Sequence, residues 1–258
     1  MPRQRKGVPG VDPKHLIKEA AQLLPDPPRR AFLRGGASLG AVAFLAGCDV
    51  IDGASAENAL RAISRFNDRA QALLFNPNRL APVFPESAIT RPFPFNAYYA
   101  EDDAPDVDGK SYALKVGGLV QEKKSWTLPE LYALPQEKQI TRHVCVEGWS
   151  AIGSWSGARL SDFLARVGAD TNAKFINFVC AEGYWSSLDM PTAMQPQTQM
   201  TFKFADQTLP RSYGFPMKIR VPTKLGFKNP KHVIEMVVTN DYPGGYWENQ
   251  GYNWFSGL

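Results

Sequence analysis

The sequence predicts an α+β fold built on a mixed β-sheet. Several short apolar or alternating segments have the length and composition of strands, at residues 112–120, 140–147, 173–181, 217–221 and 232–239. Few segments show the three- and four-residue apolar spacing of a helix, and these do not alternate regularly with the strands. Without a repeated strand–helix–strand unit, strands and short helices are expected to intermix, with a mixed sheet.

The sequence predicts three helices, at residues 55–75, 127–134 and 160–167. The first carries apolar residues every three or four positions, between an N-cap at Ser55 and a stop at Asn76-Pro77. The second begins at a capping box, Thr127-Leu-Pro-Glu130. Five prolines within residues 76–95 predict an extended segment that wraps a surface.

The N-terminal 47 residues resemble an export leader. The pair Arg29-Arg30 precedes an uncharged run over residues 35–47, which is too short to span a bilayer. Leu45-Ala-Gly-Cys48 resembles a lipoprotein processing box, which would make Cys48 a lipidated first residue; a small-residue cleavage site is the alternative. We expect twin-arginine export to the periplasm and, with Asp49 as a retention signal, a lipid anchor in the inner membrane.

Three segments are expected: a leader at residues 1–47, a tether with a helix and the proline-rich wrap at residues 48–90, and a catalytic domain at residues 91–258. The formal charge of +4 comes from the leader, because residues 48–258 hold 21 basic and 22 acidic side chains. This balance gives a nucleic-acid partner no electrostatic support. No later stretch has 18 consecutive apolar residues, so no transmembrane helix is expected after the leader.

Cys145 is the first candidate for chemistry. It lies where a predicted strand opens into a glycine-containing loop, and His143 falls on the same strand face. A positive neighbour would favour the thiolate, which binds metals or attacks electrophiles. The alternatives are a buried apolar role or a disulfide with Cys180, which an oxidising compartment would favour.

A basic segment is the second candidate. Residues 211–231 contain six basic side chains and no acid, and part of the segment is loop-like. Cations with free backbone N–H groups suit a phosphate; a solvated edge strand protected by lysines is the alternative. A third candidate, Asn96-Ala-Tyr-Tyr99, has the amide and phenol groups that can fix a polar heterocycle.

Together these motifs resemble the sulfite-oxidase-fold molybdenum enzymes, and within them the catalytic subunit of bacterial periplasmic protein-methionine-sulfoxide reductases. The resemblance covers about residues 91–258. It rests on motifs in the family's order: Cys145-Val-Glu-Gly-Trp-Ser150, Trp155-Ser-Gly-Ala, Gly214-Phe-Pro, Val221-Pro, Gly226-Phe-Lys and an aromatic tail at residues 245–254.

The resemblance implies a molybdenum–molybdopterin cofactor, with Cys145 as the only protein ligand of the metal. A Cys145–Cys180 disulfide would then be excluded. Lys218 stands where the family usually has Arg, Cys180 where the reductase has Thr and Tyr213 where it has Asn; Arg220 is available to take over from Lys218. The implied cofactor contacts are Asn96, Tyr99, Ala100, Cys145, Cys180, Tyr213, Lys218, Asn229, Pro230 and Lys231.

Oxygen-atom transfer at sulfur is the expected reaction, with Cys145, Glu147 and Trp149 at the catalytic centre. Glu147 would repel sulfite, and residues 146–158 contain no Arg or Lys to attract it. Trp149, Trp155 and Tyr184 would offer apolar walls to a thioether-like substrate. We therefore expect reduction of S-oxides such as methionine sulfoxide. The alternatives are dehydrogenation of sulfite or another S-oxoanion, and a cofactor-free lipoprotein that binds a ligand.

The expected electron partner is a membrane haem-b subunit or a periplasmic cytochrome. No dimerisation domain of the kind found in sulfite oxidases fits after Leu258, so a monomer is expected.

Overall fold

The computed structural model describes residues 53–76 and 78–258; the leader and Cys48 lie outside them. Helix α3, Gly53–Leu74, crosses the boundary between two compact units, Met1–Leu60 and Arg61–Leu258. The second unit contains both β-sheets and is the one described below. No helix among the described residues is long and apolar enough to cross a membrane.

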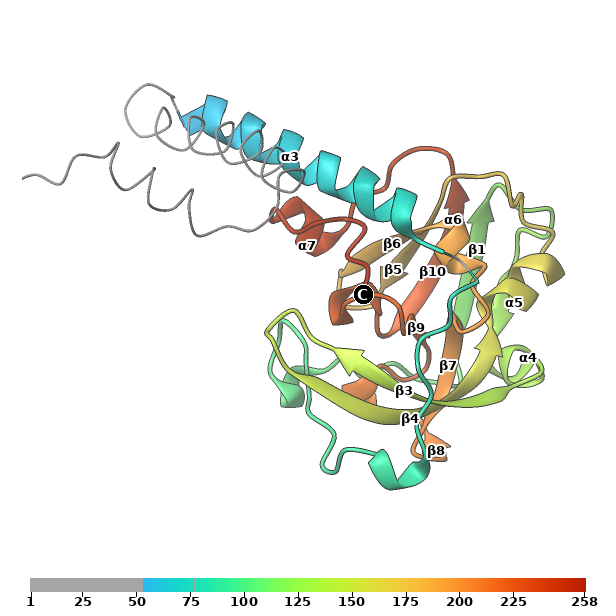
Figure 1. Cartoon of the computed structure of the whole chain (residues 1–258). Coiled ribbons are helices and arrows are strands. Elements are labelled where there is room, and N and C mark those ends of the chain that lie inside the picture. Colours follow the sequence, from blue (N-terminus) through green and yellow to red (C-terminus); the bar gives the residue numbers. More distant parts are fainter. Residues whose placement is uncertain (1–52, 77) are drawn as a thin grey trace, which may run out of the picture. The chain divides into compact units, whose positions relative to one another are not determined.

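One sheet is mixed and has the strand order β2-β1-β10-β5-β6 (Figure 1). Only β1 and β10 pair in parallel; the other neighbours are antiparallel. The strands are β1 Ala113–Gly118, β2 Ser125–Thr127, β5 Phe175–Cys180, β6 Trp185–Asp189 and β10 Val233–Thr239.

The second sheet is antiparallel and has the order β3-β4-β7-β8, with β9 also paired to β7 (Figure 1). Its strands are β3 Glu137–Val144, β4 Ser150–Arg159, β7 Gln199–Phe204, β8 Gln207–Thr208 and β9 Lys218–Arg220. The short helices are α4 Leu128–Tyr132, α5 Leu160–Arg166, α6 Met190–Ala193 and α7 Tyr246–Asn249, with 3-10 turns η1 Glu86–Ala88, η2 Glu101–Asp103, η3 Arg211–Tyr213 and η4 Gly226–Lys228.

The main core lies where α5 and strands of both sheets meet. Phe163 and Leu164 of α5 pack in one cluster with Phe178 of β5, Phe202 of β7 and Ile219 of β9, all at most 1% exposed. A smaller cluster around Trp155 and Phe93 packs on β4. Burying apolar side chains of this size is worth roughly 1.5–3 kcal/mol each, so the two sheets are fixed relative to each other by α5 and the strand contacts.

Most predicted elements are confirmed within one to three residues of their ends. The capping box forms, with Thr127 N and Oγ1 both donating to Glu130 Oε2. The proline-rich wrap is extended and follows the second sheet, since Phe84 N donates to Ile140 O of β3 and Thr90 N to Ile152 O of β4. Strands β2, β4, β6, β7 and β8 were not predicted.

The C-terminal tail packs against the second half of α3. Asp68 accepts hydrogen bonds from Asn253 Nδ2 at 2.9 Å, Trp254 N at 3.3 Å and Phe255 N at 2.7 Å. Gln71 Oε1 accepts from Gly257 N at 3.1 Å. These partly buried hydrogen bonds to the Asp68 carboxylate and the Gln71 amide therefore tie residues 253–257 to α3.

Candidate active site

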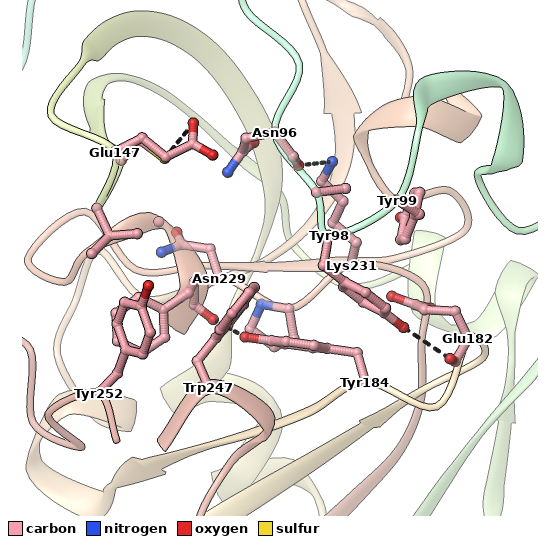
Figure 2. Close-up of a pocket in the computed structure, with 16 residues that line it drawn as sticks. Asn96, Tyr98, Tyr99, Glu147, Glu182, Tyr184, Asn229, Lys231, Trp247 and Tyr252 are labelled. Carbon is pink, nitrogen blue, oxygen red and sulfur yellow. Dashed lines mark hydrogen bonds between the residues drawn. The ribbon is translucent and has the colours of Figure 1, made fainter. Parts of the chain in front are cut away.

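A pocket of about 730 Å³, including its open mouth, lies where loops from both sheets converge. Figure 2 shows Tyr184, Trp247 and Tyr252 on one side of it and Asn96 and Glu147 on the other. The lining residues are Asn96, Ala97, Tyr98, Tyr99, Cys145, Val146, Glu147, Glu182, Tyr184, Gly226, Phe227, Asn229, Pro230, Lys231, Trp247 and Tyr252.

Cys145 reaches the pocket because β3 ends one residue before it in a tight turn. Cys145 N donates to Trp149 O and Gly148 N donates to Cys145 O, and Gly148 has φ +91°, a value that favours glycine. The cysteine is 6% exposed, and its Sγ lies 3.6 Å from Glu147 Oε2. Burial, with the neighbouring Glu147 carboxylate, raises the pKa of the Cys145 thiol. A cation or metal bound beside Cys145 would favour its thiolate form.

His143 is not the positive neighbour that the sequence suggested. It is 1% exposed, and its Nε2 lies 3.3 Å from Asn96 Nδ2. Burial and the nearby cations Arg220 and Lys218 hold the pKa of His143 well below its usual value, so the ring is neutral. The expectation that His143 stabilises the Cys145 thiolate by charge is wrong.

The disulfide alternative is also wrong, because Cys145 and Cys180 are both free thiols. Cys180 ends β5 and packs in the main core; it is not among the residues that line the pocket. Burial raises the pKa of the Cys180 thiol well above its usual value. Of these two cysteines, only Cys145 lines the pocket.

Five of the six basic residues in the basic segment form two groups with different surroundings, while Arg211 donates to the carbonyls of Ala104 and Asp102. Lys218, Arg220 and Lys231 are at most 7% exposed, and within the described residues none of them forms an ion pair with an acid. We call these three the unpaired cations. Their burial rules out the solvated edge strand.

Each unpaired cation is held by neutral groups. Lys231 Nζ donates to Asn96 O at 2.7 Å and Ser212 O at 2.8 Å. Arg220 Nη1 donates to Asn229 Oδ1 at 2.8 Å, while Arg220 Nε has no hydrogen-bond partner. Lys218 Nζ lies 5.1 Å from the centre of the Trp155 ring. Burial lowers the pKa of all three side chains.

The second group is neutralised by acids. Lys228 forms an ion pair with Glu248 of α7, and Lys224 Nζ lies 3.8 Å from Asp189 Oδ1. Lys228 and Lys224 are 1% and 2% exposed and do not line the pocket. The positive field at the pocket therefore comes from the unpaired cations, of which Lys231 is on the wall.

The remaining predicted residues are distributed around this pocket. Asn96, Tyr99, Asn229 and Pro230 line it, whereas Ala100 and Tyr213 do not. Tyr213 instead packs beside Phe93 and donates its hydroxyl to the Phe93 carbonyl at 2.7 Å.

The predicted apolar walls are partly wrong. Trp155 is fully buried in the smaller core cluster and does not reach the pocket. Trp149 does not line the pocket and donates Nε1 to Glu147 Oε2 at 2.9 Å. Tyr184 does line the pocket, as expected. Trp247 and Tyr252 join it, because α7 and the turn that follows bring them there.

Glu182 is a pocket residue that the sequence reasoning missed. It lies two residues after the end of β5, much as Cys145 lies just after β3. An acid directly after the predicted strand at residues 173–181 could have identified it as a pocket residue. Its Oε2 is buried without a hydrogen-bond partner, and Tyr98 Oη donates to its backbone carbonyl at 3.0 Å (Figure 2). Burial raises the pKa of Glu182 to about 7, so this carboxyl can hold a proton near neutral pH.

No group of three or more His, Cys, Asp and Glu side chains within residues 53–76 and 78–258 has a metal-binding arrangement. Comparison with known proteins identifies the family instead. Residues 101–247 match the family described as "Oxidoreductase molybdopterin binding domain". This match lies inside the predicted catalytic segment, residues 91–258.

Two relatives are similar over different shares of their length. A putative protein-methionine-sulfoxide reductase subunit YedZ1 from Azospira oryzae is 57% identical over 95% of this chain and 93% of its own. A protein-methionine-sulfoxide reductase catalytic subunit MsrP from Ralstonia nicotianae is 31% identical over 53% of this chain. That alignment spans 46% of the MsrP protein, so the chain matches about half of that relative's length.

A solved structure shares the fold. The sulfane dehydrogenase SoxCD from Paracoccus pantotrophus superposes with a TM-score of 0.50 and 20% identity, over 54% of this chain and 40% of that one. The resemblance and the α+β fold predicted from the motifs are confirmed. By its domain match and by its similarity to the Azospira oryzae protein over nearly its whole length, the chain belongs to the family of oxidoreductases with a molybdopterin-binding domain.

Proposed function

We propose that this oxidoreductase reduces S-oxides such as methionine sulfoxide, using a molybdenum–molybdopterin cofactor whose metal is bound by Cys145 Sγ. The names of the two reductase relatives support the substrate class. The structural observation that carries the proposal is one pocket whose lining combines a buried thiol, Cys145, with a buried lysine, Lys231, that forms no ion pair among the described residues.

The residues present fit such a cofactor. A soft sulfur ligand suits a sulfur-rich metal centre, and metal binding would supply the positive charge that the Cys145 thiolate lacks. Asn229 and Lys231 on the wall would hold a phosphate, with Arg220 orienting Asn229 from behind. A Cβ at Gly226 would lie 2.7 Å from His143 Nε2, which is too close, so glycine is required at this point of the pocket wall.

When bound, the cofactor supplies two-electron oxygen-atom transfer at sulfur. Reduction of a sulfoxide breaks its S–O bond, consumes two electrons and two protons, and releases a thioether and water. The protein's own side chains decide what enters. Tyr184, Trp247 and Tyr252 give an apolar wall for a neutral thioether-like group. Glu147, beside Cys145, repels oxyanions. Glu182 Oε2 is the site at which a proton can be held within the pocket.

Electrons would come from a membrane haem-b subunit or a periplasmic cytochrome. A location in the periplasm, with Cys48 acylated at the inner membrane, would place a monomer beside such a donor. Both the location and the donor rest on the leader sequence and the proposed reaction.

The decisive experiment measures molybdenum and pterin in the exported protein, followed by turnover with sulfoxides and with sulfite. We expect one molybdopterin per chain, and sulfoxide reduction in preference to sulfite oxidation. Preference for sulfite with a cytochrome acceptor would favour the dehydrogenase, and absence of molybdenum would favour a cofactor-free binding protein.

Cys145 is tested directly by substitution. Cys145→Ala should fold, as judged by circular dichroism, but lose molybdenum-dependent turnover. Cys180→Ala removes the other buried thiol and should keep both metal and turnover, because Cys180 packs in the core. If Cys145→Ala reduced sulfoxides at the parent rate, Cys145 could not be the metal ligand that the reaction requires.

A further inference from the structure

Helix α3 presents a row of exposed apolar side chains. Ile63, Phe66, Leu73 and Leu74 are 57%, 69%, 85% and 83% exposed. At ~100° per residue they fall within an arc of about 100° on one side of the helix. Large apolar side chains gathered on one exposed face mark an interaction surface. We call these four residues the α3 stripe.

The stripe is not the face that α3 uses to dock on the protein. Docking uses Ser64, Asp68 and Gln71, which hold the C-terminal tail through Asn253, Phe255 and Gly257. These contacts are polar, so the apolar side of the helix contributes little to the fold. A helix that only needed to dock would not require four large apolar residues facing solvent.

Basic side chains flank the stripe. Arg65 and Arg69 are exposed and lie on the part of the helix between the stripe and the docking face. The one acid in residues 61–74, Asp68, already accepts three hydrogen bonds from the tail. An apolar face bordered by arginines is the pattern of helices that lie in the plane of a membrane interface, with the cations on anionic headgroups.

The position of α3 in the chain agrees with this surface. Cys48 precedes the first residue of α3, Gly53, by five residues, so an acyl chain on Cys48 would place the helix next to the bilayer. An acyl chain and an interfacial helix together give the two signals that stable anchoring takes. We propose that α3 lies in the interface of an anionic phospholipid bilayer, with the α3 stripe among the acyl chains. This inference rests on the proposed export and anchoring.

The test places an environment-sensitive fluorophore on the stripe. Phe66→Cys in the exported full-length protein is labelled with a nitrobenzoxadiazole group, and Ala72→Cys, exposed on the arginine side, is the matched control. Cys145 and Cys180 are buried, and labelled parent protein gives the background of these two thiols and of any Cys48 that carries no acyl chain. Each protein is mixed with phosphatidylcholine vesicles, with and without phosphatidylglycerol.

Emission from position 66 should shift to the blue and be quenched by brominated lipids in phosphatidylglycerol vesicles, while emission from position 72 should not. Arg65→Glu with Arg69→Glu should raise the lipid concentration for a half-maximal shift at least about tenfold. An unchanged spectrum at position 66 would overturn the inference. A blue shift that grows with protein concentration in the absence of lipid would also overturn it, because a second copy of the protein would then cover the α3 stripe.

Mass analysis of Cys48 separates this inference from the proposed anchor. If Cys48 is acylated but the fluorophore at position 66 remains in water, the proposed lipid anchor is supported and the interfacial position of α3 is contradicted. A protein without an acyl chain whose position 66 enters the bilayer overturns the anchor and supports the helix.

Discussion

Replacing Lys231 by Met tests whether the unpaired cations cost stability before a cofactor binds. Burial lowers the pKa of Lys231 from its ordinary 10.5 to about 8. Between these two values the unfolded chain binds more protons than the folded protein, so Lys231 makes stability rise with pH across that window. Methionine has a similar length and does not titrate.

The size of the effect follows from the shift. A pKa difference of about 2.5 units corresponds to roughly 3 kcal/mol at 1.36 kcal/mol per unit, most of which develops between pH 8 and 10.5. The stability of the parent relative to Lys231→Met should therefore increase by about 2.5 kcal/mol from pH 8 to pH 10.5. The hydrogen bonds to Asn96 O and Ser212 O that Lys231→Met loses change the difference in unfolding free energy by the same amount at every pH. They leave the pH trend in place.

Urea unfolding of the cofactor-free proteins at several pH values measures this difference. Lys115→Met, which removes an exposed lysine from β1, is the matched control and should show no such trend. Parallel stability curves for the parent and Lys231→Met would refute the reasoning. In the exported enzyme, Lys231→Met and, more strongly, Lys231→Glu should lower molybdopterin content; full occupancy would remove Lys231 from the phosphate site.

Three further predictions concern acids. Glu147→Gln should raise turnover of sulfite relative to sulfoxide, because a charge that repels anions is gone; an unchanged ratio in steady-state assays would count against this role. Sulfoxide reduction should fall as pH rises through about 7, where Glu182 loses its proton, and Glu182→Gln should remove that step from the pH–rate profile; an identical profile would contradict it. Asp68→Ala should cost about 2–4 kcal/mol in urea unfolding, through lost charge-assisted bonds to the tail. The exposed Asn67→Ala on the same helix should cost far less, and equal losses would rule out the tail as the cause.

Local rules were enough for elements whose signals are contiguous in the chain. The capping box at Thr127 and the alternation that ends at Cys145 each involve neighbouring residues, so the sequence alone placed α4 and the end of β3. Strand β4 was missed because it is rich in Gly and Ser, which are uncommon in strands. Gly157 is required there by its partner strand, since a Cβ would lie 1.9 Å from Met200 O.

The site was predictable in its residue types but not in its electrostatics. Six basic residues in one segment predicted a positive surface, yet only the fold reveals that Glu248, twenty residues beyond Lys228, neutralises that lysine. The same holds for His143, whose charge depends on cations brought from β9 and the loop before β10. Ion pairing and burial of these side chains depend on the tertiary structure, so the spacing of residues in the sequence does not predict them.

The contact between α3 and the C-terminal tail has a consequence for the order of events during synthesis. Asp68 and Asn253 are 185 positions apart, so at about 5–20 residues per second the helix waits roughly 10–40 s for its docking partner to be made. During that interval an unfinished chain carries an undocked α3 close behind residues 1–47, which we predict to be an export leader. Docking of α3 therefore requires that residues 253–257 have been made and have folded, and under the proposed export it would occur next to the segment that the export machinery recognises.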